Sequence, residues 1–252
     1  MKLLKLLYRF YILLKPQYGY NIFAIMYKMF GFTAEYLKYK ALHNNKQFIV
    51  SAMDWYPCLK DKTETTPLDP VYFYQDAWAA RKIFENKPLH HYDVGSLAKT
   101  IGIISQFVPT TMVDIRPVEL PLDNLYFKKG SILELPFEDN SIESISSLCV
   151  VEHIGLGRYG DPLDQFGSEK AIAELIRVTK HNGFIYFSVP VENENKVYFN
   201  GHRAFKRDYI ITLFKECKII DELYILNNRL SQTFEKSKGY TVGLFLMKKI
   251  GE

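Results

Sequence analysis

The order of strands and helices after residue 88 is the feature that most constrains how this chain can fold. Short apolar runs predict buried strands at 89–94, 110–115, 142–151 and 184–189. Helical periodicity of the apolar residues fills the intervals at 97–107 and 169–180. Strands that alternate with helices form a mostly parallel sheet covered on both faces, so the sequence predicts an α/β protein.

The carboxyl-terminal part follows another pattern. A helix is predicted at 207–214, and strands at 217–226 and 240–248 follow it with no helix between them. Two strands joined in this way pair antiparallel. With a brief strand near 126–132, the pattern predicts a seven-stranded, mostly parallel sheet with an antiparallel last strand. Ser168 is interpreted as the N-cap of the helix that follows it, and His181-Asn182-Gly183 as the stop of that helix.

Composition and charge exclude several classes of protein. The chain has 252 residues, and its three cysteines, an odd number without CxxC spacing, argue against a disulfide scaffold or a zinc site and favour a reducing cytoplasm. Positions 1–50 carry a net charge of +7, which leaves −3 of the total +4 for the rest. A body of that sign lacks the basic face of a nucleic-acid binder. His90-His91 has no clustered carboxylate, so no metal site is expected.

The first 49 residues are predicted to form a helical lid or docking segment ahead of an α/β domain at 50–252. Lys2, Lys5 and Arg9 recur at helical spacing among apolar residues, which predicts an amphipathic helix with a basic stripe. Its apolar face can cover the main domain or a second copy in a homodimer, and this interpretation is favoured. The alternative is peripheral contact with an anionic inner-membrane surface.

Two strand ends predict a nucleotide-type ligand. The first strand ends in Asp93-Val94-Gly95-Ser96, where glycine lets a ligand approach the backbone. Asp114 ends the second strand, about 20 residues later, the spacing at which an acid binds a ribose diol. Only Gly95 of a G-x-G-x-x-G pattern is present, which disfavours a pyrophosphate and therefore a nicotinamide-dependent oxidoreductase. A ligand with a ribose and no phosphate fits better, and S-adenosyl-L-methionine is the common one.

Later motifs carry a resemblance to a known family. Leu135-Pro136-Phe137 is followed by Asp139-Asn140-Ser141 and by an apolar strand that leads to Glu152-His153. In these motifs the chain resembles the class I S-adenosylmethionine-dependent methyltransferases of the type 11 group. With its segments at 72–83, 93–96, 113–119, 135–164 and 197–205, it also resembles a bacterial family of methyltransferase-like proteins filed as a domain of unknown function. Members of that family are often encoded in surface-polysaccharide gene clusters.

The resemblance implies a Rossmann-like methyltransferase fold with S-adenosyl-L-methionine as cofactor. By match to the family motifs, the first loop (Asp93, Gly95 and Ser96) would hold the methionine part and Asp114 the ribose. Ile115, Ser131 and Ile132 would flank the adenine, with Ser131 in place of the usual aspartate. The implied activity is methyl transfer to a small hydroxyl or phosphoryl-type acceptor, nucleotide-linked or glycan, in capsule or lipopolysaccharide synthesis.

The residues after the central strand are candidates for the chemistry. His153 is the predicted base for a hydroxyl acceptor, with a structural histidine as the alternative, and His202 is the second candidate. Glu152 would orient His153 or bind the methionine amine, with a salt bridge as the alternative. The predicted acceptor contacts are Arg158, Tyr159, Asp161 and Arg203.

Three aromatic or polar residues on one predicted helix face, Tyr74, Gln75 and Trp78, could cover the cofactor, although packing is favoured for Trp78. The alternative to a methyltransferase is a binding protein that keeps the same fold and has lost catalysis.

Overall fold

The structure is a computed structural model that describes residues 22–42, 45, 47–116, 118–234 and 240–251. The chain forms two compact units, Met1–Pro67 and Leu68–Glu252. The sequence places the boundary at 49/50, and the contacts place it after Pro67. The predicted amphipathic helix at 1–14 lies outside the described residues. None of the described helices is long and apolar enough to cross a membrane.

The first unit is built on helix α2 (Ile22–Leu42). After the short helix η2 (Ala52–Asp54), Trp55 packs edge-on against Phe32, at 5.2 Å between ring centroids, and against Tyr36, at 5.1 Å. The Lys62 ammonium lies 2.7 Å from a Glu35 carboxylate oxygen. Residues 51–62 therefore return along α2 and are held there by aromatic contacts and one exposed ion pair.

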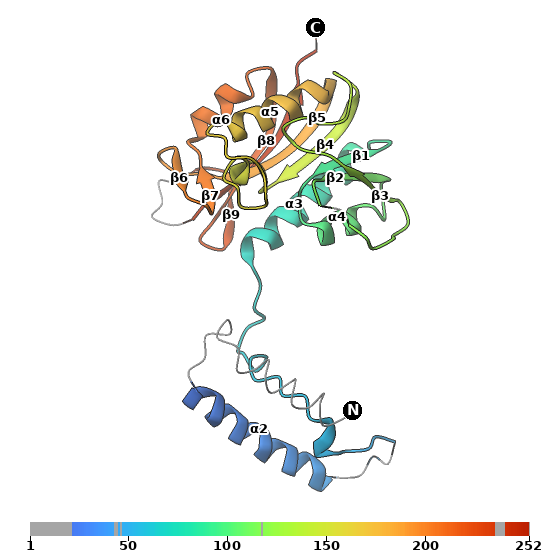
Figure 1. Cartoon of the computed structure of the whole chain (residues 1–252), viewed down its shortest axis with the longest axis vertical. Coiled ribbons are helices and arrows are strands. Elements are labelled where there is room, and N and C mark those ends of the chain that lie inside the picture. The colour runs from blue at the N-terminus through green and yellow to red at the C-terminus, as the bar shows by residue number, and fades with distance from the viewer. Residues whose placement is uncertain (1–21, 43–44, 46, 117, 235–239, 252) are drawn as a thin grey trace. The chain divides into compact units, whose positions relative to one another are not determined.

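The second unit contains a Rossmann-like sheet with eight strands (Figure 1). In spatial order the strands are β3 (Leu125–Lys129), β2 (Thr110–Asp114), β1 (His91–Val94), β4 (Ile142–Leu148), β5 (Thr179–Pro190), β10 (Val242–Lys249), β8 (Cys217–Leu226) and β9 (Arg229–Ser231). The first five are mutually parallel, and β10 pairs antiparallel with both β5 and β8. The predicted fold class and the antiparallel end are therefore confirmed.

The predicted count of seven strands is wrong by one, because β9 forms a hairpin with β8. Asn227 and Asn228 connect the two strands with φ angles of 48° and 61°. Positive φ at both central residues is the requirement of a type I′ turn, and asparagine tolerates it. The chain therefore reverses at once and adds a short edge strand.

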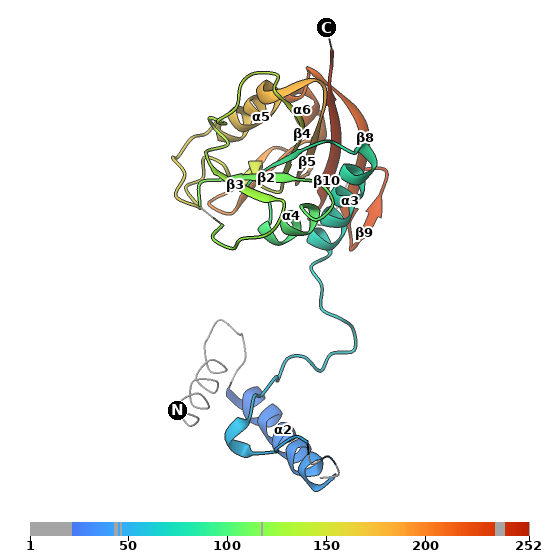
Figure 2. The ribbon, with the colours of Figure 1, turned by 90° about the vertical axis from the view of Figure 1, so that its right-hand side faces the viewer.

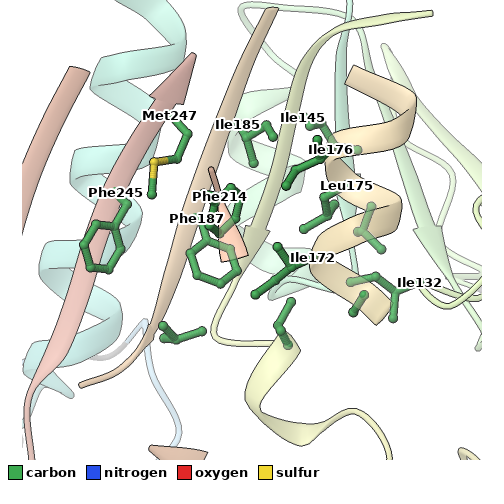
Figure 3. Close-up of a cluster of buried hydrophobic side chains, with 14 of the residues drawn as sticks. Ile132, Ile145, Ile172, Leu175, Ile176, Ile185, Phe187, Phe214, Phe245 and Met247 are labelled. Carbon is green, nitrogen blue, oxygen red and sulfur yellow. The ribbon is translucent and has the colours of Figure 1, made fainter. Parts of the chain in front are cut away.

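Helices cover both faces of the sheet (Figure 2). Helices α5 (Gly167–Val178) and α6 (Arg207–Leu213) pack on one face and α3 (Pro70–Asn86) and α4 (Ala98–Ile104) on the other. Figure 3 shows Ile172, Leu175 and Ile176 of α5 directed at the strands, and all three are buried. Burying such side chains stabilises the fold by about 1.5–3 kcal/mol each.

The ends of α5 differ from those predicted. The helix begins at Gly167, and Ser168 donates from its Oγ to the Val151 carbonyl at 2.7 Å instead of capping the helix. The helix ends at Val178, before the predicted stop, and β5 begins at once with Thr179. The prediction of Ser168 as N-cap is therefore wrong, because the buried carbonyl of Val151 competes for its hydroxyl.

A separate two-stranded hairpin, β6 (Lys196–Tyr198) and β7 (His202–Ala204), follows β5. The sequence did not predict it, because three-residue strands have too few positions for a readable alternation. This hairpin brings Gly201 and His202 to the end of β4.

Both buried clusters of the sheet lie wholly within the second unit, so we expect it to fold by itself. Chains that begin near Gln47 or at Leu68 should stay soluble and melt cooperatively near the temperature of the full chain. Circular dichroism melts of the three chains test this. Aggregation or loss of cooperativity in both shortened chains would show that the first unit contributes to the core.

Candidate functional site

A cleft of about 470 Å³ opens at the carboxyl ends of β1, β2 and β4. The strand order reverses between β1 and β4, which is where ligands bind in open α/β sheets. The volume lies within the range of small-molecule sites. Predicted site residues that line the cleft are Gly95, Ser96, Asp114, Ile115, Ser131, Ile132, His153, Tyr159 and Asp161.

The loop after β1 is held by the carboxylate of Asp93. Ser96 donates to it from its backbone N–H at 3.0 Å and from its Oγ at 2.6 Å, and Ser146 of β4 donates at 2.5 Å. Asp93 is fully buried and does not line the cleft. Burial raises its pKa to about 6, against the lowering effect of these hydrogen bonds. The structure therefore places Asp93 behind the loop, where it fixes the loop's shape.

Gly95 forms the floor of the cleft at this loop. Its φ is +71°, and a Cβ there would lie 3.0 Å from Cγ1 of Val150. Any side chain would therefore be strained in its backbone and crowded against the neighbouring strand end. The backbone is left open to a ligand at this point.

The β2 side of the cleft offers a carboxylate beside apolar surface. Asp114 accepts the N–H of Arg116 at 2.8 Å through Oδ1, and among the described residues Oδ2 has no hydrogen-bond partner. Ile115 is partly exposed and Ile132 is buried, so both offer apolar contact. The Ser131 hydroxyl accepts the N–H of Leu133 at 3.2 Å and so stabilises the turn that contains both residues. This arrangement suits a ribose diol and an adjacent flat base.

His153 ends the 3-10 helix η3 (Val151–His153), which follows β4. Its Nδ1 lies 2.6 Å from the Gly201 carbonyl oxygen. Because a carbonyl only accepts, Nδ1 carries the proton and Nε2 keeps its lone pair. Burial lowers the pKa of His153 below its usual value, so the ring is neutral near pH 7. His153 therefore lines the cleft with a neutral ring whose Nε2 is unprotonated.

Glu152 lies next to this histidine but is turned into the protein. The residue is 1% exposed, and Oε2 has no hydrogen-bond partner within the described part of the chain. Oε1 is 3.8 Å from His153 Nε2, too long for a hydrogen bond. Burial raises the pKa of Glu152 to about 8. The carboxyl group is therefore neutral near pH 7, which argues against the salt bridge given as the alternative for Glu152.

Two predicted acceptor contacts have structural partners instead. Arg203 is 7% exposed, donates to the carbonyls of Ile154 (2.5 Å) and Asp164 (3.0 Å) and does not line the cleft, so its prediction as an acceptor contact is wrong. Asp161 lines the cleft, but its carboxylate accepts the N–H of Gly155 at 2.6 Å and shapes the loop. Both side chains hold the 155–167 segment in place.

His202 lies outside the cleft lining. Its ring packs against Tyr198, at 4.9 Å between centroids, and edge-on against Tyr240, at 5.6 Å. Burial lowers its pKa. His202 therefore belongs to an aromatic cluster, and it follows Gly201, the residue whose carbonyl contacts His153.

Helix α3 reaches the cleft through a residue that the sequence analysis missed. Tyr72 lines it, whereas Tyr74 donates to the Asn228 carbonyl, Gln75 accepts from Ser188 and Trp78 is buried. Packing for Trp78 is thus confirmed. Arg116, after β2, is the other missed residue, and its position two residues after Asp114 was the available signal. Among the described residues, no three His, Cys, Asp or Glu side chains gather as a metal site would need.

One family profile matches part of this chain. Residues 134–237 match the profile of a family described as a Caenorhabditis protein of unknown function, DUF268. No curated protein matches the sequence. The surface-polysaccharide context implied by the sequence resemblance receives no support from these comparisons.

Three solved structures define the class of fold. The [4+2]-cyclase SpnF has a TM-score of 0.54 at 13% identity, over 71% of this chain and 81% of that one. A Burkholderia thailandensis 1,6-didemethyltoxoflavin-N1-methyltransferase, solved with S-adenosylhomocysteine, has a TM-score of 0.53 at 14% identity (70% and 79%). The N-methyltransferase NodS from Bradyrhizobium japonicum has a TM-score of 0.53 at 12% identity (73% and 98%). The second unit therefore has the fold of class I S-adenosylmethionine-dependent methyltransferases.

Proposed function

We propose that this protein transfers a methyl group from S-adenosyl-L-methionine to a hydroxyl of a small acceptor. The observation that carries the proposal is the cleft itself, whose lining includes the open backbone of Gly95, the carboxylate of Asp114 and the neutral ring of His153. The first two features suit the methionine and ribose parts of the cofactor. The third suits removal of a proton from the acceptor.

Separate residues of the cleft would bind the cofactor and take the acceptor proton. The cofactor supplies an activated methyl group on a sulfonium. Gly95 and Asp114 would bind it, and the cleft walls at Ile115 and Ile132 would pack on its base. His153 would take the acceptor proton at Nε2 while Nδ1–H stays bound to Gly201. Alignment of donor and acceptor in the cleft would supply much of the remaining rate.

Asp114→Ala tests the ribose assignment. Loss of a charged hydrogen-bond acceptor should weaken S-adenosylhomocysteine binding by about 1.5–3 kcal/mol. Isothermal titration calorimetry measures this, with Asp123→Ala, an exposed acid in the same β2–β3 connection, as the matched control. Equal affinities of Asp114→Ala and the unchanged protein would contradict the assignment.

A binding protein without methyl transfer is the second candidate. One structure of similar fold is a [4+2]-cyclase, so the fold alone does not require methyl transfer. Cofactor binding without S-adenosylhomocysteine release on a panel of glycans and nucleotide-sugars would support it. The role in surface-glycan assembly and the cytoplasmic location are part of our proposal and rest on the sequence alone.

A further inference from the structure

Two guanidinium groups share one tyrosine at the mouth of the cleft. The Cζ atoms of Arg116 and Arg158 lie 4.8 Å and 5.2 Å from the ring centroid of Tyr159. Arg116 and Tyr159 line the cleft, and Arg158 is exposed beside them. The two cations stand within about one Debye length of each other, about 10 Å at 0.1 M salt, so they repel unless an anion lies between them.

Two carboxylates lie near this pair, and both accept backbone N–H groups of nearby residues. Asp114 accepts the backbone N–H of Arg116 and lies 3.5 Å from its Nε. Asp161 accepts N–H groups of Gly155 and Tyr159 in its own loop. Arg158 has no carboxylate within ion-pair distance in the part of the chain that the structure describes. Arg116 therefore has one carboxylate at ion-pair distance, whereas Arg158 has none among the described residues.

Arg158 is also fixed in place. Its Nη1 donates to the Gly201 carbonyl at 2.9 Å, and the same oxygen accepts from Nδ1 of His153 at 2.6 Å. A guanidinium group has five N–H donors, so this one bond leaves most of them available. The hairpin turn at Gly201 thus holds a cationic group with open donors directly beside the predicted base.

We propose that Arg116 and Arg158 bind a phosphoryl group of the acceptor, with Tyr159 as their shared platform. This inference rests on the proposed function and names its substrate class, an acceptor that carries a phosphate or diphosphate. Guanidinium groups bind such oxyanions through paired, charge-assisted hydrogen bonds. The cofactor contains no phosphate, so a phosphoryl group bound here would come from the acceptor. A phosphate bound here would lie near the His153 ring, because Arg158 and His153 share the Gly201 carbonyl oxygen.

The test is a calorimetric titration, in which inorganic pyrophosphate is added to protein saturated with S-adenosylhomocysteine. We expect binding to the unchanged protein, and a loss of about 10- to 100-fold in Arg116→Met and in Arg158→Met. Arg229→Met, in the exposed strand β9, is the matched control and should bind like the unchanged protein. Absence of pyrophosphate binding, or an unchanged affinity in both arginine variants, would overturn the inference.

A second pair of titrations separates the acceptor from the cofactor carboxylate. S-Adenosylhomocysteine has that carboxylate and 5′-methylthioadenosine lacks it. If Arg158→Met weakens only the former, Arg158 binds the cofactor and the inference is wrong. Similar affinities of both ligands in Arg158→Met and in the unchanged protein support it. Should S-adenosylhomocysteine not bind at all, the proposed function fails, while the pyrophosphate titration of the ligand-free protein still reports on the arginine pair.

Discussion

His153→Ala should lower turnover by about 10²–10⁴-fold while S-adenosylhomocysteine binds as before. The reason is that Nδ1 is committed to the Gly201 carbonyl, which leaves Nε2 as the nitrogen able to take a proton. General-base catalysis contributes a factor of this size. The assay follows S-adenosylhomocysteine release with a panel of nucleotide-sugars and phosphorylated glycans as acceptors.

The matched control is His181→Ala, because this exposed histidine bonds the Ile250 carbonyl through the same ring nitrogen, 3.0 Å away. It should turn over like the unchanged protein. The pH profile gives a second criterion. Since burial lowers the pKa of His153, the activity that depends on the neutral ring should persist below pH 6.5, the usual pKa of histidine, and fall only at lower pH.

Two outcomes would contradict this role. A parallel loss of cofactor affinity in His153→Ala would mark the histidine as structural, since the Gly201 turn would then have moved. Unchanged turnover would mean that alignment alone drives the reaction or that the base lies elsewhere, with His202 the next residue to replace.

The strand ends could be predicted because each is marked by local chemistry. Gly95 and Asp114 follow apolar runs, and the chain places both on one cleft. The face of α5 could be predicted as well, since Ile172, Leu175 and Ile176 recur at helical spacing and are buried. In both cases the signal lies within a few residues of the feature it predicts.

The roles that failed depend on contacts between distant segments. The sequence shows that Arg203 is a cation. It does not show that backbone carbonyls at Ile154 and in the 155–167 loop accept hydrogen bonds from its guanidinium group. That loop is close-packed, because a Cβ on Gly155 would lie 2.1 Å from the Asp164 carbonyl oxygen. The partner of His153 is likewise 48 positions away, at Gly201. Periodicity and spacing carry no information about such pairs.

Glu152→Gln should make the protein more stable than the unchanged chain at pH 9, and about equally stable at pH 5. The carboxyl is buried and Oε2 has no partner among the described residues, so its ionised form is costly in the folded state. Its pKa is about 8 when folded and 4.5 when unfolded. The contribution of Glu152 to the free energy of unfolding is thus fully present below pH 4.5 and is lost as the pH rises through 8.

The size of the effect follows from the same shift. It corresponds to a difference on the order of 5 kcal/mol in the free energy of unfolding at pH 9, because each pKa unit is worth about 1.4 kcal/mol. Glutamine keeps the shape and stays neutral, so the variant lacks this pH dependence. Urea unfolding at pH 5, 7 and 9 measures it, with the exposed Glu134→Gln as control. Parallel pH dependences of the unchanged protein and Glu152→Gln would show that Glu152 is ionised in the fold, which would restore it as a candidate partner for the cofactor's amine.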